Sequence, residues 1–163
     1  MKIRMDYVTN SSSSSFILGF DDMEDYNDMI TYCDDMNYPQ IIDIIKNIQK
    51  YPLYSREEIL NIIYNYYALK YKDKLLKERY DSDKISFSEK IKIENSEEFK
   101  KELKEIVNQD EEYQTLIKEA NEKELLLFGE IWDSYGGIVE WAIRNGFMKE
   151  ELRRWCLLNY CVG

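Results

Sequence analysis

The sequence contains no histidine, the residue most often used as a general base near neutral pH and the most common zinc ligand. Catalytic mechanisms that depend on a Ser–His or Cys–His pair are excluded for the same reason. A general acid or base in this chain must therefore be Asp, Glu, Tyr, Lys or Cys. This restriction favours a binding role over a catalytic one.

Cysteine is also scarce: there are three, and Cys33 lies far in the sequence from Cys156 and Cys161. An odd number in this arrangement does not predict a disulfide framework. A C-x4-C pair with no second pair and no histidine is a poor metal site. We expect reduced thiols in a packed core, with a redox or metal role for Cys156 and Cys161 as the alternative, and we predict no metal and no cofactor.

Long apolar runs are missing as well. No segment approaches the roughly 18 apolar residues of a membrane span, and the opening MKIRMDYVTN lacks the apolar part of a signal peptide. Neither G-x-x-x-x-G-K-[ST] nor G-x-G-x-x-G occurs, so no nucleotide-phosphate site is predicted. We expect a cytoplasmic protein without a membrane partner, folded as a single domain over residues 1–163.

Basic residues are absent from Met5 to Ile45, although this segment contains nine acids. With Lys2 and Arg4 included, residues 1–45 carry two basic and nine acidic residues, a net charge of −7. The other 118 residues carry 20 basic and 23 acidic residues, a net charge of only −3. The acidity is therefore local, and its sign argues against direct binding of nucleic acid or anionic lipid.

The acidic segment contains a predicted strand followed by a predicted helix. FILGF, after a serine-rich turn at 10–15, predicts a strand near 14–20. Asp21 or Asp22 then caps a helix that extends to about Met36. Its predicted apolar side consists of Met23, Tyr26, Ile30 and Cys33, and its predicted acidic face of Asp21, Asp25, Asp28 and Asp35.

Further helices are predicted along the middle of the chain. Pro39 opens one to about Lys50, and a capping box at Ser55 and Glu58 opens another to about Tyr80. Apolar residues alternate over 85–93, so residues 81–95 are expected to form a short hairpin or an extended connector. Seven of the 14 tyrosines lie between 51 and 80. We expect them to be either interface residues or core residues whose hydroxyl groups lie at the edge of the core.

A long, charged helix is predicted from Ser96 to about Glu122. Its apolar residues follow a heptad pattern, interrupted by Asp110. The helix either covers the core, breaks near 108–110, or projects and pairs with a partner helix. In the last case it forms a homodimer through Phe99, Leu103, Ile106, Tyr113 and Ile117.

The C-terminal third completes the predicted fold. LLLFGEIWD predicts a buried strand at 124–133, and residues 138–146 predict a helix that ends at Gly146. Residues 148–162 suit either helix or strand, and apolar residues on both faces favour a strand near 153–161. The predicted class is α+β, with four to five helices, one of them long, against a small, mainly antiparallel sheet.

The string KIRMDYVTNSSSSSFIL resembles the opening of many small proteins of anaerobic bacteria and their phages. EIWDSYGGIVEWAIRNGF resembles, more faintly, a strand–turn–helix unit of some of those proteins. The resemblance brings no activity and no residue role. It implies a phage or mobile-element setting, hence the host cytoplasm, and a small α+β fold in which FILGF pairs with LLLFGEIWD.

The leading hypothesis is a non-catalytic binding protein whose acidic face occupies a basic, nucleic-acid-binding surface of another protein. In a phage setting the target would be a host defence nuclease, and the protein an inhibitor of the anti-CRISPR kind. Tyr32 and Tyr135 are further candidate contacts, together with Asp133 and Glu140. The alternatives are a small carboxylate-based hydrolase built on Asp133 and Glu140, a helix-mediated assembly protein, or an acidic face that only keeps the protein soluble.

Overall fold

The computed structural model describes residues 13–80, 85–131 and 147–162. Its contacts divide the chain into two compact units. Unit 1 comprises Met1–Ile59 and Glu122–Gly163, and unit 2 comprises Leu60–Asn121. The α+β class is confirmed, but the described residues contain seven helices rather than the four to five predicted.

Unit 1 contains a three-stranded antiparallel sheet. The central strand is β1 (Ser13–Phe20), which pairs with β2 (Leu125–Ile131) on one side and β3 (Cys156–Val162) on the other. All three predicted strands are confirmed, as is the pairing of FILGF with LLLFGEIWD. β1 is central because apolar side chains occupy both of its faces, which gives it two buried surfaces.

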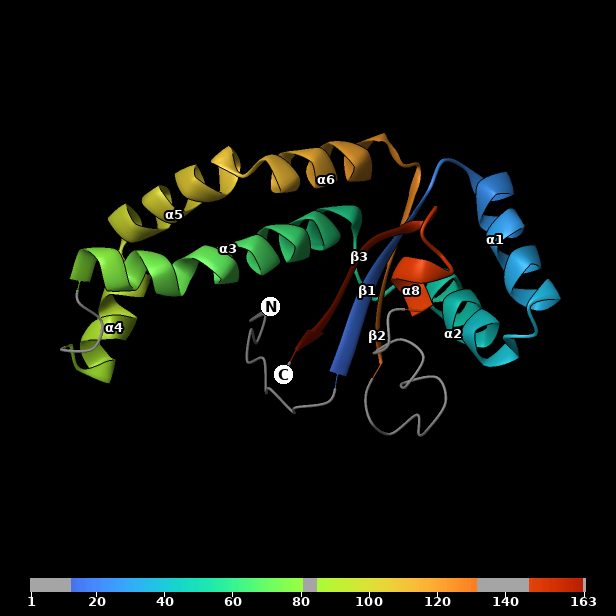
Figure 1. Cartoon of the computed structure of the whole chain (residues 1–163), viewed down its shortest axis with the longest axis horizontal. Coiled ribbons are helices and arrows are strands. Elements are labelled where there is room, and N and C mark those ends of the chain that lie inside the picture. Colours follow the sequence, from blue (N-terminus) through green and yellow to red (C-terminus); the bar gives the residue numbers. More distant parts are fainter. Residues whose placement is uncertain (1–12, 81–84, 132–146, 163) are drawn as a thin grey trace. The chain divides into compact units, whose positions relative to one another are not determined.

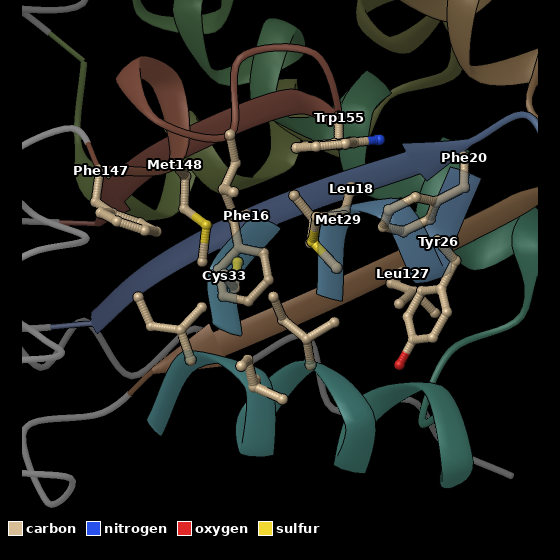
Figure 2. Close-up of a cluster of buried hydrophobic side chains, with 14 residues drawn as sticks. Phe16, Leu18, Phe20, Tyr26, Met29, Cys33, Leu127, Phe147, Met148 and Trp155 are labelled. Carbon is tan, nitrogen blue, oxygen red and sulfur yellow. The ribbon is translucent and has the colours of Figure 1, made fainter. Parts of the chain in front are cut away.

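Three helices cover one face of this sheet: α1 (Met23–Asp35), α2 (Pro39–Lys50) and the short α8 (Phe147–Glu150). Figure 1 shows them on the same side of the strands. Phe16, Leu18 and Phe20 alternate along β1 and point into the core between sheet and helices (Figure 2). The helices and the segment before β3 fill this core with Tyr26, Met29, Cys33, Ile41, Ile42, Ile45, Phe147, Met148, Leu152 and Trp155.

Local signals set the limits of α1 as predicted. The Asp22 carboxylate accepts a hydrogen bond from the Asp25 N–H at 2.8 Å and caps the first turn. Beyond the helix, Asn37 has φ 59°, a left-handed conformation that stops helix propagation. The predicted apolar side needs correction, because Met23 is 46% exposed whereas Met29, not in the prediction, is fully buried.

Four helices form unit 2, the first of which begins at the end of unit 1: α3 (Arg56–Tyr80), α4 (Phe87–Glu94), α5 (Glu97–Gln109) and α6 (Glu111–Glu122). The predicted capping box of α3 is confirmed, since the Ser55 N–H donates to Glu58 at 2.8 Å. The hairpin or connector expected over 85–93 is wrong. A capping box between Ser86 and Glu89 starts α4 there instead.

The segment 96–122 is two helices, with the break in the predicted place. Asp110 has an extended backbone, and its carboxylate accepts the Tyr113 N–H at 2.9 Å, which starts α6. The inward residues also differ from the predicted seam: Val107 and Leu116 are buried, whereas Ile106 and Ile117 are only partly buried.

The residues proposed for a homodimer seam are largely used inside unit 2. Phe99, Leu103 and Tyr113 are buried, and the Tyr113 ring packs edge-on against Tyr64 and Tyr67. Three of the five side chains are therefore packed inside unit 2, and the pairing with a second chain stays a prediction. The same contacts show that two of the clustered tyrosines, Tyr64 and Tyr67, pack inside unit 2.

Gly129 of β2 provides a direct test of the core packing. It lies opposite Phe16 in the sheet, and a Cβ atom at this position would lie 2.7 Å from two Phe16 ring carbons. We expect Gly129→Ala to lower the free energy of unfolding by about 1–3 kcal/mol, because the buried ring cannot move away freely. Urea denaturation of both proteins measures this difference.

Gly19→Ala is the matched control. A Cβ atom there would lie 2.7 Å from Leu157 Cδ1 and 2.8 Å from Lys123 Cγ, in two flexible side chains that are partly exposed and can move more easily than the buried ring. A loss at Gly19 as large as that at Gly129 would contradict the proposed role of the Phe16 ring.

Candidate functional site

The acidic character of the chain resides mainly in unit 1. Unit 1 contains 10 basic and 18 acidic residues, a net charge of −8, whereas unit 2 contains 12 and 14, a net charge of −2. Long-range attraction of a basic partner would therefore be directed toward unit 1. The positions of the α1 acids decide which surface such a partner would meet.

Asp25, one of the four residues of the predicted acidic face, is buried in unit 1. Its Oδ1 accepts hydrogen bonds from the Trp155 indole N–H at 2.9 Å and from the Arg154 guanidinium at 2.7 Å. Its Oδ2 accepts the Asp21 N–H at 3.1 Å. Asp25 is thus a structural residue that joins α1 to the segment before β3, and it must be removed from the acidic face.

The pKa of Asp25 is lowered from its ordinary value of 3.8. Burial alone would raise it, but the hydrogen bonds from Trp155 and the Asp21 backbone, with the charges of Arg154 and Lys123, outweigh that effect. The carboxylate is therefore ionised at neutral pH, and its negative charge strengthens the hydrogen bonds that it accepts.

With Asp25 turned inward, a different set of residues forms the exposed side of α1. Glu24, Asp28, Thr31 and Asp35 are all exposed and recur at spacings of 4, 3 and 4. This spacing keeps side chains on one face of a helix, over about 16 Å of its length. We call the three carboxylates of this row, Glu24, Asp28 and Asp35, the acidic stripe.

No described basic residue forms an ion pair with the acidic stripe. Asp21 differs, because Lys123 lies 2.8 Å from its carboxylate and offsets its charge. Asp28 and Asp35 were in the predicted face, and Glu24 was not. The sequence contains the pattern Glu24-x3-Asp28-x6-Asp35. The prediction instead placed Asp21 and Asp25 on the same helix face as Asp28 and Asp35, and so it missed Glu24.

Of the further candidates, only Tyr32 lies within the described residues. It is partly buried, its hydroxyl donates to the Glu151 carboxylate at 3.0 Å, and its ring lies 6.0 Å from that of Trp155. The other candidates, Asp133, Tyr135 and Glu140, lie outside the described residues. The carboxylate pair of the hydrolase alternative, Asp133 and Glu140, is among them.

The thiols that can be described are unreactive. Burial raises the pKa of Cys33 and of Cys156 to about 11, so both are protonated at neutral pH. Cys156 lies opposite Leu18 and Cys161 opposite Ser14, which places them about 13 Å apart along the sheet, too far for a disulfide. Over the described ranges, no three Cys, Asp or Glu side chains gather as metal ligands would.

Where the structure describes the chain, no helix combines the length and apolar character needed to cross a bilayer. Comparisons with known protein families, with curated proteins and with solved structures found no match for this chain.

The lowered pKa of Asp25 predicts a pH-dependent contribution to stability. The ionised carboxylate stabilises the fold above its unfolded-state pKa near 3.8, and this contribution is lost as the pH falls through the lower folded-state pKa. We expect Asp25→Asn to cost about 1–3 kcal/mol at pH 7 and less as the pH falls from 5 to 2. Urea denaturation at each pH measures both values.

Asp28→Asn, which removes the same charge from an exposed position of α1, is the control and should change stability by less than about 0.5 kcal/mol. Equal losses in both variants at pH 7 would mean that the contacts of Asp25 contribute no more than a surface charge.

Proposed function

We propose that the chain is a non-catalytic protein-binding module of a phage or mobile element. Its acidic stripe occupies a basic, nucleic-acid-binding surface of a host protein, in the manner of an anti-CRISPR inhibitor of a defence nuclease. The observation that carries this proposal is the row of three exposed carboxylates on α1, with no ion pair to any described basic residue.

Electrostatics supports a surface of this kind as a binding site. Carboxylates at positions i and i+4 of a helix have Cβ atoms about 5–6 Å apart, and like charges at that spacing destabilise the isolated helix. A row of lysine or arginine side chains on a partner would remove this repulsion and accelerate association. The stripe is rigidly presented, because the opposite side of α1 is buried in the core of unit 1.

The setting in a phage or mobile element rests on the N-terminal string KIRMDYVTNSSSSSFIL and its resemblance to phage and bacterial proteins. The choice of a nucleic-acid-binding target rests on charge. A protein surface that binds phosphates is basic, so a row of carboxylates can compete for it with DNA or RNA. The lack of histidine supports a role without catalysis, since the usual general base is missing.

Charge removal on the stripe tests this proposal. We expect the triple variant Glu24→Gln, Asp28→Asn and Asp35→Asn to lose capture of a basic host protein at low salt, because each exposed pair contributes about 0.2–1 kcal/mol. Capture from host lysate at two salt concentrations, followed by competition with duplex DNA, measures this loss. Capture by the native protein should weaken with salt and with added DNA.

The matched control removes three exposed acids of unit 2, with Glu98→Gln, Glu105→Gln and Glu119→Gln. It changes the net charge by the same amount, so its capture should resemble that of the native protein. Equal loss in both triple variants would assign binding to net charge alone, and undiminished capture by the stripe variant would contradict the proposal.

A further inference from the structure

Within the described part of the chain, no strand pairs with the outer edge of β2. β2 pairs with β1 on its inner side, and no backbone hydrogen bond from another described residue reaches its outer side. Unpaired N–H and C=O groups along an edge strand are a template for another strand. Proteins commonly protect such edges with lysine or proline, but β2 reads LLLFGEI, with Glu130 as its one charged residue.

An exposed apolar loop accompanies this strand. Residues 51–55 connect α2 to α3, and within them Leu53 is 87% exposed and Tyr51 60% exposed. The neighbouring Tyr54 packs edge-on against Phe128 of β2, with ring centroids 4.9 Å apart. The loop is therefore held against the side chains of β2.

A second attachment fixes the same loop to the start of β2. The Arg56 guanidinium donates hydrogen bonds to the backbone carbonyls of Lys123 and Glu124, the latter at 3.0 Å. Glu124 immediately precedes the first residue of β2. The loop is therefore attached to β2 and to the residue before it through Tyr54 and Arg56, while Tyr51 and Leu53 in the same loop are exposed.

Glu130 adds a charge requirement to this surface. It lies opposite Ser15 in the sheet, is partly buried, and has no described basic residue within ion-pair distance. Burial raises the pKa of its carboxyl group, so a nearby cation would favour its ionised form. Leu126, Phe128 and Glu130 alternate onto one face of the sheet as two apolar positions and one acidic position. Leu126 is buried there, and Phe128 and Glu130 are partly exposed.

We propose that the outer edge of β2 binds an extended segment of another protein, with apolar side chains beside Leu126 and Phe128 and a lysine or arginine beside Glu130. Backbone pairing supplies affinity in this mode of recognition, and the alternate side chains supply specificity. The net charge of −10 and the acid within the strand favour a basic segment over a second copy of this chain. This surface does not depend on the acidic stripe.

A designed peptide tests the inference with the full chain. Acetyl-Lys-Thr-Val-Thr-Val-Thr-Val-amide, aligned antiparallel with its lysine opposite Glu130, places its first two valines opposite Phe128 and Leu126. We expect this peptide to slow the amide exchange of β2 residues, as observed by NMR. Glu130→Gln should weaken its binding about fivefold, and the acidic-stripe variant should bind it unchanged.

Two altered peptides serve as controls. The same sequence with glutamate in place of lysine should bind the native protein about fivefold more weakly, and it should lose this disadvantage against Glu130→Gln. Methylation of the valine nitrogens should abolish binding, because it removes backbone donors. Circular dichroism confirms that Glu130→Gln is folded.

Three results would overturn the inference: no β2 protection at millimolar peptide, protection confined to other elements, or β2 protection that grows with protein concentration without peptide. The last would show that a second copy occupies the edge. If the native protein captures a basic host protein but does not bind the peptide, only this inference is rejected. If it binds the peptide but captures no basic host protein, only the function proposed for the stripe is rejected.

Discussion

The buried carboxylate of Asp25 fixes the rotation of α1 about its axis. Two side-chain donors reach it from positions 129 and 130 residues further along the chain, and a backbone N–H reaches it from Asp21. Bonds to a charged acceptor are about twice as strong as neutral ones, and loss of a partner leaves a buried group unsatisfied. The side of α1 that carries Asp25 must therefore face the core, and the side with Glu24, Asp28 and Asp35 must face outward.

This constraint connects the packing of unit 1 to its electrostatics. Trp155 both fills the core and supplies a donor to Asp25, while Arg154 lies over the Trp155 ring at 5.3 Å. The two basic residues near the start of α1, Arg154 and Lys123, pair with Asp25 and Asp21. The charges of Asp21 and Asp25 are thus neutralised by neighbouring basic residues. The charges of the acidic stripe are not neutralised by any described basic residue.

Much of the fold follows from local sequence signals. The apolar run of FILGF predicted β1, Pro39 predicted the start of α2, and the Ser55–Glu58 pair predicted the start of α3. Among the described elements, α4 was predicted with the wrong type, although it too has a local signal in Ser86 and Glu89. There the alternating apolar residues of 85–93 suggested a short hairpin or a connector, whereas Ser86 and Glu89 fit the capping-box pattern that starts a helix.

The rotation of α1 could not be predicted in this way. Acids at Asp21, Asp25, Asp28 and Asp35 and acids at Glu24, Asp28 and Asp35 both fit a helical repeat, so periodicity alone did not distinguish the two phases. The deciding contacts come from Arg154 and Trp155, whose approach depends on the pairing of β3 with β1. Similarly, Ile106 and Val107 both fit a helical repeat from Leu103, and the structure buries Val107.

Zero-length carbodiimide cross-linking in host lysate is the sharpest test of binding through the acidic stripe, because it joins a carboxylate to a partner lysine only where the two are in contact. We predict that mass spectrometry will find cross-links from Glu24, Asp28 or Asp35 to a basic, nucleic-acid-binding protein. Cross-links confined to carboxylates of unit 2, or to acids of unit 1 away from the exposed side of α1, would contradict it.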